Sequence, residues 1–304
     1  MSNEIAAIIL TFNEEIHIER CLRSILPVTD EIYVIDSFSR DKTVEIAKSL
    51  GARVAQRKWK HYSDQFAWGL DHFQPRCDWI LRMDADEYFE PDLQEELPHL
   101  IQNADDDLMG IYLKRKTVFN GKFIRHGGTY PMYMLRVWRN GAGEIEQRWK
   151  DAHVTLPPGT KTIIAEGGWV DESLKGITFW VKKHNDYASG EAIDLLNIKY
   201  QFFKDDQSLL MSSDKQAKRK RIIKRNYYSR LPLGLRAWLY FLYRYVLRLG
   251  FLDGREGFVW HYLQGFWYRH LVDVKIREVT RACGEDREKM IAYFSDVFGL
   301  DIRQ

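Results

Sequence analysis

Nine residues, Trp79-Ile80-Leu81-Arg82-Met83-Asp84-Ala85-Asp86-Glu87, form an apolar run that ends in three carboxylates within four positions. Residues 79–83 predict a short buried strand, interrupted only by Arg82. Open α/β sheets bind ligands beyond the carboxyl ends of their strands, which is where these acids would lie. Two aspartates separated by one residue suit a divalent cation with oxygen ligands, and a nucleotide diphosphate would complete its shell. The same pattern also occurs in acidic turns, so neighbouring segments have to distinguish the two interpretations.

The residues before this stretch alternate between strand and helix patterns. Residues 5–10 are continuously apolar, and apolar residues recur at helical spacing from 18 to 25. Asn13 is expected to cap that helix at its amino end. Strands at 32–36 and 53–55 flank a second helical pattern at 44–50 that stops at Gly51. This alternation predicts right-handed βαβ units and an α/β fold with a largely parallel sheet.

The residues that follow Glu87 have a different sequence pattern. Pro91 is expected to open a helix that Pro98 bends or shortens. Asn120-Gly121 and Asn140-Gly141 are hairpin signals, which predict an antiparallel or mixed second half of the domain. Residues 171–197 are expected to pass from a loop into a helix.

The composition changes again beyond residue 205. Basic residues crowd 215–225, and two amphipathic helices are predicted at 235–249 and 258–271, joined by the glycine-bounded turn 250–254. We therefore expect one larger domain at 1–205, with a first part at about 1–105 and a second part at about 106–205. Residues 206–304 are expected to form a basic, aromatic helical extension.

Bulk composition narrows the functional classes. The chain has 304 residues, 45% of them hydrophobic, and a formal net charge of only +2. This charge is too small to create a positive electrostatic potential over the whole protein that would attract nucleic acid. Its three dispersed cysteines argue against a disulfide framework or a zinc cluster and for a reducing compartment. The amino terminus lacks a signal-peptide pattern, and no stretch of eighteen uncharged apolar residues occurs, so a cytoplasmic location is expected.

Polar residues that end neighbouring strands should converge on one ligand. Thr11 to Glu14 and Asp36 end strands on the same sheet edge as Asp84 and Asp86. Asp36 could accept a hydrogen bond from a uracil imide, or it could stabilise a turn or a helix start. Position alone leaves both roles open.

Three motifs in this order resemble family 2 glycosyltransferases, whose fold is called GT-A: residues 11–15 (TFNEE), 36–43 (DSFSRDKT) and 84–87 (DADE). The similarity covers roughly residues 1–100. It implies that residues 1–205 are a catalytic domain, with nucleotide-sugar binding in about 1–105 and the acceptor side in about 106–205. Residues 180–188 (WVKKHNDYA) and 250–254 (GFLDG) also resemble a bacterial branch that builds envelope polysaccharides and lipopolysaccharide.

The resemblance implies inverting transfer of a sugar from a nucleotide diphosphate sugar, most often a UDP-sugar, to a saccharide or lipid-linked acceptor. The metal, Mg²⁺ or Mn²⁺, would be held mainly by Asp86 and would act as a Lewis acid on the departing diphosphate. Asp84 would face the ribose or the donor sugar. The remaining residues implied to contact the nucleotide sugar are Thr11, Phe12, Asn13, Glu14, Asp36, Asp64 and Ala85.

Inverting displacement needs a general base opposite the leaving group, and Asp151 is the candidate, within residues 148–153 (RWKDAH). The related branch has Asp-Glu-His here, whereas this sequence has Ala152 before His153. If the missing glutamate were the base, the chain would be a catalytically impaired nucleotide-sugar-binding protein in envelope assembly. His153 could pack in the core or line the acceptor side. Three further acids are alternative candidates for the general base, namely Glu144, Glu146 and Asp171.

His184 and Tyr187 lie one helical turn apart and could line the acceptor or diphosphate side, or could pack in a core. The basic run and the aromatic helices suit an anionic membrane surface, which would place the protein on the inner face of the cytoplasmic membrane. The same helices could instead cover the catalytic core or form a homo-oligomer interface. A nucleic-acid partner is disfavoured, because the basic run has no interleaved stacking residues. Nucleotidyl transfer is a further alternative, although the loop after the first strand is not glycine-rich.

Overall fold

The computed structural model describes residues 4–146, 153–203, 209, 212 and 214–302. These residues form two compact units. The first comprises residues up to 123, 129–174 and 208–215, and the second comprises 124–128, 175–207 and 216–304. The division follows Leu174 and so differs from the boundary expected near residue 205. The long helix that begins at Gly176 groups with the carboxyl-terminal helices, not with the sheet.

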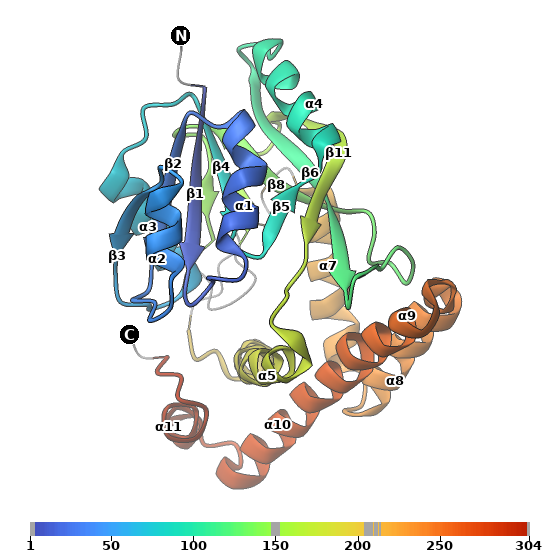
Figure 1. The fold of residues 1–304 in the computed structure, drawn as a ribbon. Coiled ribbons are helices and arrows are strands. Elements are labelled where there is room, and N and C mark those ends of the chain that lie inside the picture. The colour runs from blue at the N-terminus through green and yellow to red at the C-terminus, as the bar shows by residue number, and fades with distance from the viewer. Residues whose placement is uncertain (1–3, 147–152, 204–208, 210–211, 213, 303–304) are drawn as a thin grey trace. The chain divides into compact units, whose positions relative to one another are not determined.

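The amino-terminal half of the first unit is the predicted βαβ array (Figure 1). Strands β3, β2, β1 and β4 lie in this order and pair in parallel. In this register Thr11 lies opposite Asp36 on one side of β1, and Leu10 lies opposite Asp84 on the other. The polar ends of three strands are thereby brought to one sheet edge. The elements are β1 (Ile5–Thr11), α1 (Ile18–Ile25), η1 (Leu26–Val28), β2 (Glu31–Asp36), α2 (Thr43–Ser49), β3 (Arg53–Gln56), α3 (Tyr62–Phe73) and β4 (Trp79–Asp84).

The rest of this unit makes the sheet mixed, as the hairpin signals predicted. Strand β8 pairs antiparallel with β4 and β6, β11 is parallel to β6, and β5 is antiparallel to β11. This mixed α/β sheet, followed by helices, is the arrangement that the GT-A resemblance implied. The elements are β5 (Glu87–Phe89), α4 (Pro91–Gln102), β6 (Leu108–Phe119), β7 (Lys122–Phe123), β8 (Met132–Arg139), β9 (Glu144–Ile145), β10 (Val154–Thr155) and β11 (Lys161–Asp171).

Three local expectations have different outcomes. Asn13 does not cap α1: it adopts a left-handed conformation with φ of 54°, and the helix begins five residues later, after His17. Helix α4 contains Pro98 and continues to Gln102, so this proline does not shorten the helix. Asn120-Gly121 does turn β6 into β7, but the strands on either side of Asn140-Gly141 pair with other partners.

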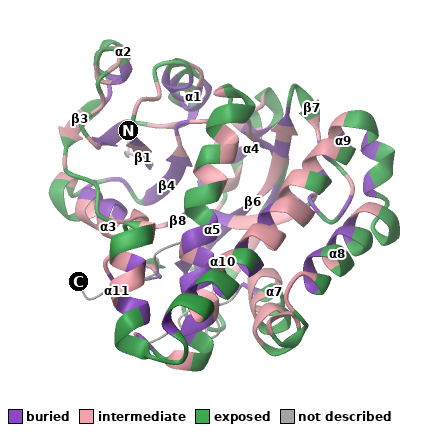
Figure 2. Ribbon diagram, turned by 90° about the horizontal axis from the view of Figure 1, so that it is seen from below, coloured by how far each residue is buried: buried purple, intermediate pink, exposed green. Residues whose placement is uncertain are grey.

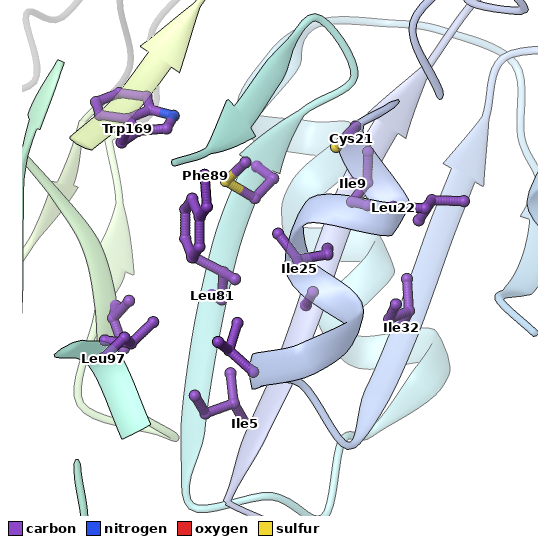
Figure 3. Close-up of a cluster of buried hydrophobic side chains, with 14 of the residues drawn as sticks. Ile5, Ile9, Cys21, Leu22, Ile25, Ile32, Leu81, Phe89, Leu97 and Trp169 are labelled. Atoms are coloured by element: carbon purple, nitrogen blue, oxygen red, sulfur yellow. The ribbon is translucent and has the colours of Figure 1, made fainter. Parts of the chain in front are cut away.

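The core on one face of the sheet explains why α1 and β5 lie where they do. Figure 3 shows Leu22 and Ile25 of α1 directed at the sheet strands, with Phe89 of β5 and Trp169 of β11 continuing the same apolar layer. Burying a side chain of this size stabilises the fold by roughly 1.5–3 kcal/mol. The same layer fixes β5 immediately after Asp86, so the acidic turn is held from both ends.

The second unit is helical. Its helices run on through π-helical segments, from Leu235 to Leu247 and from Gly254 to Cys283. In Figure 2, helix α7 is coloured only as intermediate or exposed. No helix in the described ranges is long and apolar enough to cross a membrane. The elements are α5 (Gly176–Tyr200), α7 (Lys215–Asn226), η2 (Tyr228–Arg230), α8 (Leu235–Leu242), η3 (Tyr243–Leu247), η4 (Gly250–Asp253), α9 (Gly254–Trp260), η5 (His261–Trp267), α10 (Tyr268–Cys283) and α11 (Arg287–Phe298).

Residues 124–128 leave the sheet and pack within the helical unit. Asp253 accepts hydrogen bonds from the His126 backbone N–H over 2.8 Å and lies 2.6 Å from its ring Nδ1. The buried His261 ring lies against Gly127 and Gly250, where a Cβ atom would come within 2.0 Å and 2.6 Å of ring atoms. Gly127 also has a φ of +68°, which favours glycine. The GFLDG turn therefore fastens this segment through Asp253 and through a close backbone approach.

Candidate active site

Asp36 is fully buried at the end of β2, and its carboxylate is hydrogen-bonded within the protein. Oδ1 accepts from Thr11 Oγ1 over 2.9 Å and also from the Ser39 hydroxyl. Oδ2 accepts from Ser39 N over 2.8 Å and from Gln56 Nε2 over 2.9 Å. This carboxylate links the ends of β1, β2 and β3, which is the turn-stabilising role that the sequence left open.

The loops after β1 and β2 are tied together by backbone-to-side-chain hydrogen bonds. The N–H groups of Asn13 and Glu14 donate to Ser39 Oγ over 2.8 Å and to Thr43 Oγ1 over 2.7 Å. Asn13 Oδ1 in turn accepts from Arg40 N over 2.8 Å. The left-handed conformation of Asn13 makes this exchange possible. The TFNEE and DSFSRDKT motifs thus form one rigid corner.

His17 connects this corner to the end of β11. Its ring is fully buried, with Nδ1 at 2.6 Å from Glu14 Oε2 and Nε2 at 2.7 Å from the Leu174 backbone nitrogen. A backbone N–H can only donate, so Nε2 is the acceptor and Nδ1 carries the hydrogen given to Glu14. Glu14 is thereby oriented by a buried imidazole.

Asp84 ends β4 within a frame of aromatic and cationic groups. Its Oδ1 accepts from the Tyr62 hydroxyl over 2.9 Å, and that hydroxyl accepts from Arg82 Nε over 2.7 Å. Its Oδ2 lies 3.7 Å from Arg136 Nη2, and its side chain is 33% exposed. Arg82, which interrupts the apolar strand in the sequence, lies over the Tyr62 ring at 4.3 Å. Tyr62 and Arg136 therefore fix the orientation of the Asp84 carboxylate, which remains accessible to solvent.

Glu87 and Arg136 form a buried ion pair beneath the acidic turn. Arg136 Nη2 donates to Glu87 Oε1 over 2.8 Å, and the guanidinium lies 4.1 Å above the Trp169 ring. Glu87 Oε2 accepts from the Asp84 backbone N–H over 2.8 Å. Burial raises the pKa of Glu87 well above its usual range, although Arg136 opposes that shift. Of the three acids of the motif, Glu87 thus supports the turn from inside.

Asp86 lies in the turn itself and is partly exposed. Its backbone carbonyl accepts from Glu172 N over 3.1 Å and from Arg20 Nη2 over 3.5 Å. Arg20 also binds Glu172 Oε2 over 2.6 Å and lies 4.4 Å above the Tyr88 ring. The backbone of the Asp-Ala-Asp turn is held by groups from α1 and from the end of β11.

These two aspartates are the candidates for holding a metal. Within the part of the chain that the structure describes, no group of three or more His, Cys, Asp or Glu side chains could hold an ion. Mg²⁺ in phosphate sites is usually held by one or two carboxylates, with substrate phosphates and water supplying the other ligands. Asp84 and Asp86 are hard oxygen donors, one residue apart and both partly exposed, so they fit a cation of that kind.

The segment that contains the candidate general base, Asp151, is described only up to residue 146 and from residue 153 onward. Asp151 and Ala152 lie outside the described residues, between β9 and β10 in the sequence. His153 pairs with the buried Glu146 through its backbone, which donates to Glu146 Oε2 over 3.1 Å. Ser63 Oγ donates to the Glu146 carbonyl over 2.6 Å, next to Tyr62 on α3. The first turn of α3 therefore contacts both Asp84 and the base of the segment that contains Asp151.

The other residues that were predicted to contact the nucleotide sugar differ in their exposure to solvent. Phe12 is 55% exposed, Thr11 and Ala85 are buried, and Asp64 on α3 pairs with Arg57 at 2.8 Å. Together with Asp36, Asp84 and Asp86 they belong to the first unit.

His184 and Tyr187 belong to α5 in the helical unit. The His184 ring stacks on Trp180 at 3.5 Å, and Nδ1 lies 2.9 Å from the Trp180 carbonyl. Tyr187 and Tyr268 contact the same ring edge-on, each at 5.6 Å. Both residues therefore take part in aromatic contacts of the helical unit, but Tyr187 is 36% exposed and does not lie in its core.

The sequence did not identify Tyr62, Arg136, Arg20 or Glu172 as site residues. Each comes from a different element, and each acts on the acidic turn through tertiary contact, so no local spacing marks it. The one available signal was Arg82, a cation inside an apolar strand that needed a partner.

Residues 6–165 match the family model described as glycosyl transferase family 2. An uncharacterized glycosyltransferase of Rickettsia bellii is 27% identical, over 93% of this chain and 89% of that protein. LpsC, a lipopolysaccharide core biosynthesis glycosyltransferase of Rhizobium meliloti, is 29% identical over 51% of this chain and 58% of its own length.

Among solved structures, glucosyl-3-phosphoglycerate synthase of Mycobacterium tuberculosis, crystallised with Mn²⁺, UDP and glucosyl-3-phosphoglycerate, is similar at 22% identity with a TM-score of 0.31. That likeness covers 38% of this chain and 44% of the synthase. The family match spans more than half of the sequence, and its range includes the strand-end residues described above. The chain therefore belongs to glycosyl transferase family 2 and is a glycosyltransferase.

Proposed function

We propose that this glycosyltransferase moves a sugar from a nucleotide diphosphate sugar, in the first instance a UDP-sugar, to a hydroxyl of a saccharide or lipid-linked acceptor in envelope polysaccharide synthesis. The observation that carries the proposal is the placement of Asp84 and Asp86, both partly exposed, on the sheet edge where β1 and β2 also end. That edge is where open α/β sheets bind nucleotides.

The donor would lie along this edge. Phe12 and Asn13 would contact the nucleotide base, while the buried Thr11 and Asp36 would hold the loops that position it. Asp86 would hold the divalent cation, with Asp84 directed at the ribose or the donor sugar. When bound, the cation would offset the charge that develops on the leaving diphosphate.

Transfer with inversion requires deprotonation of the acceptor hydroxyl on the side away from the diphosphate. We assign that role to Asp151. Its flanking strands are anchored through Glu146 to Ser63, one residue from the tyrosine that holds Asp84. An impaired site, in which Ala152 replaces the true base, is the competing interpretation.

A lipid-linked acceptor would explain the surface of the helical unit. Exposed apolar residues recur on one side of α8 and η3, namely Trp238, Leu239, Leu242, Tyr243, Val246 and Leu247. Helix α7 has no buried residue and carries seven Lys and Arg side chains within 215–225. Aromatic and basic residues combined in this way favour peripheral binding to an anionic membrane surface, which for this protein would be the cytoplasmic face.

The test is transfer or hydrolysis measured on a panel of nucleotide sugars with Mn²⁺ or Mg²⁺. We expect turnover with one UDP-sugar, its abolition by EDTA, and a loss of at least about 100-fold in Asp86→Asn, on the scale of losing a group that stabilises the leaving charge. Asp105→Asn is the matched control, because Asp105 is an exposed aspartate that pairs with Lys161 and is not part of the acidic turn. Absence of both turnover and nucleotide binding with every donor would refute the proposal.

Flotation with vesicles tests the membrane component. The protein should float with anionic vesicles, less so at high salt, and Trp238→Ser combined with Leu242→Ser should reduce flotation. Failure to bind anionic vesicles at any ionic strength would remove the membrane component and leave the transferase proposal intact.

A further inference from the structure

Strand β5, which follows Asp86, is an edge strand of the sheet and is only three residues long. Its antiparallel pairing with β11 ends where Glu87 lies opposite Asp171. One further hydrogen bond, from Glu172 N to the Asp86 carbonyl over 3.1 Å, extends this ladder to Asp86. A short edge strand is paired on one side only, so its end is the place where the ladder opens most easily. The position of Asp86 therefore depends on the groups that close this end.

Arg20 of α1 closes this end from outside the ladder. Its Nη1 donates to Glu172 Oε2 over 2.6 Å, and its Nη2 donates to the Glu172 carbonyl over 2.7 Å. The same Nη2 lies 3.5 Å from the Asp86 carbonyl oxygen, and the guanidinium carbon lies 4.4 Å from the centroid of the Tyr88 ring. One planar guanidinium therefore contacts both chain segments at the end of the ladder. Its rigid fork of donors permits this, whereas an ammonium group is a single point of contact.

Two further residues of α1 contact the backbone of the same turn. Cys21 Sγ donates to the Asp84 carbonyl over 3.6 Å, and Ser24 Oγ accepts from Phe89 N over 3.1 Å. Arg20 and Ser24 lie four positions apart on the helix, so their contacts come from one side of α1. The helix itself is packed into the apolar core against the sheet. Helix α1 therefore serves as a rigid template for the backbone on both sides of Asp86.

The charge of Arg20 and its geometry have opposite consequences for a cation bound by Asp86. Arg20 and Glu172 form an ion pair whose side chains are 28% and 17% exposed. If only charge mattered, the loss of Arg20 would leave Glu172 as an additional anion near the turn and would strengthen cation binding. If Arg20 acts by holding the Asp86 backbone, its loss would weaken binding, because a ligand that is not preorganised has to be ordered when the ion binds. The sign of the change separates the two effects.

We propose that Arg20 is a positioning residue for the divalent cation of the donor site. By joining Asp86 to Glu172 at the end of β5, it holds the Asp86 carboxylate where the cation binds. The role is indirect, since Arg20 contacts the backbone of Asp86 and the side chain of Asp86 contacts the ion. This assignment rests on the metal role proposed above for Asp86.

The test measures the Mn²⁺ affinity of the full chain by calorimetric titration with saturating UDP, so that no sugar is transferred. We expect Arg20→Gln to weaken Mn²⁺ binding about 10-fold to 100-fold, the usual range for a group that orients a metal ligand. Arg20→Lys keeps the charge but cannot bridge the two chain segments with paired donors, so it should weaken binding by a smaller factor. Asp86→Asn should abolish binding, which would identify the titrated ion as the one at the acidic turn.

Arg115→Gln is the matched control. Arg115 pairs at 3.5 Å with Asp171, the neighbour of Glu172, and its side chain is 25% exposed, close to the value for Arg20. The substitution removes the same charge beside the end of β11, but this ion pair is with a side chain and not with the backbone of the turn. Mn²⁺ affinity should stay within about twofold of the parent value or rise, because only a partly exposed pair is lost.

Kinetics provide a second readout. In Arg20→Gln the concentration of Mn²⁺ needed for half-maximal activity should rise, while kcat at saturating Mn²⁺ stays near the parent value. This combination is expected when binding is lost and transition-state stabilisation is not. Urea unfolding shows whether each variant is folded under the assay conditions.

The outcomes separate failure of this assignment from failure of the proposed function. Mn²⁺ binding that is unchanged or tighter in Arg20→Gln, equal to the parent value in Arg20→Lys, or weakened equally in Arg115→Gln overturns the role of Arg20 and leaves Asp86 as the metal ligand. Absence of Mn²⁺ binding by the parent chain, or binding that is unchanged in Asp86→Asn, overturns the metal role of Asp86 and the role of Arg20 with it.

Discussion

The Tyr62 hydroxyl donates to Asp84 Oδ1 over 2.9 Å while it accepts from Arg82 Nε over 2.7 Å. Burial raises the pKa of Tyr62 far above its ordinary value, so the phenol remains a donor at every pH at which the enzyme would be assayed. We predict that Tyr62→Phe lowers kcat/KM for the donor about tenfold, because Asp84 loses the group that orients it. Steady-state kinetics against donor and metal concentration measures the effect.

Tyr33→Phe is the control for this prediction. Tyr33 also donates to a carboxylate, Glu31 Oε2 over 2.7 Å, on a strand of the same sheet but away from the acidic turn. Both variants should lose about 1 kcal/mol of stability, the ordinary net value of one hydrogen bond. If the Tyr33 variant lost donor kcat/KM to the same extent, the effect of Tyr62 would be one of stability and not of positioning.

A second prediction concerns the ion pair beneath the turn. Arg136→Met would leave Glu87 buried beside Asp84 without its cation, and we expect it to cost roughly 3–5 kcal/mol in the free energy of unfolding. Urea denaturation measures this cost. Adding Glu87→Gln should recover part of it, since the buried charge is then removed.

Arg115→Met serves as the comparison on the same sheet. Arg115 pairs with Asp171 at 3.5 Å, and both side chains are partly exposed, so removing its charge should cost less than about 1 kcal/mol. Equal losses in the Arg115 and Arg136 variants would contradict the claim that the Glu87 pair supports the turn.

The polar residues at the ends of the strands could be predicted from the sequence, because each strand is marked locally by an apolar run that ends in polar residues. Apolar runs followed by polar residues located β1, β2 and β4, and parallel pairing then brought Thr11, Asp36 and Asp84 to one edge. The groups that orient these residues were not predictable in the same way. Arg136 reaches Asp84 from β8, and Arg20 reaches the Asp86 carbonyl from α1, through contacts that no spacing rule encodes.

The expected boundary near residue 205 illustrates another limit. The composition changes only where the basic run begins, whereas packing changes at Leu174, because α5 buries Ala188, Ala192 and Leu196 within the helical unit. A long helix of mixed character carries no sequence signal for the unit against which it packs.

A third prediction follows from His261, whose ring lies between Gly127 and Gly250. Burial, with Arg244 next, lowers its pKa from 6.5 to about 4. The unfolded chain therefore binds one more proton than the folded chain between these two values, so stability is complete above about pH 6.5 and falls as the pH drops toward 4. His126 and Asp253 are the other titratable groups acting on this ring.

The loss assigned to His261 should approach roughly 3 kcal/mol between pH 6.5 and pH 4, at about 1.4 kcal/mol per pK unit. Denaturant unfolding at several pH values, compared between the parent chain and His261→Asn, isolates this contribution because all other groups are common to both. Parallel stability curves for the two proteins would show that His261 does not titrate on unfolding.

The fourth prediction addresses the base. If Asp151 accepts the acceptor proton, Asp151→Asn should lower kcat by about 100-fold to 10,000-fold, the range for losing a general base. The KM for the donor should change little, since the proposed site assigns donor binding to Asp84 and Asp86 and not to Asp151. Glu144→Gln, at an exposed acid on the strand before this segment, should leave kcat near the parent value.

Ala152→Glu separates the two accounts of this site. It restores the Asp-Glu-His pattern of the related branch, so an impaired enzyme would gain activity by orders of magnitude, whereas an enzyme that uses Asp151 would gain little. The double variant Asp151→Asn/Ala152→Glu then places the two candidate bases in direct competition. Activity recovered in that variant would assign the proton to position 152, and continued inactivity with intact nucleotide binding would assign it to Asp151, because only the group in line with the acceptor hydroxyl can take its proton.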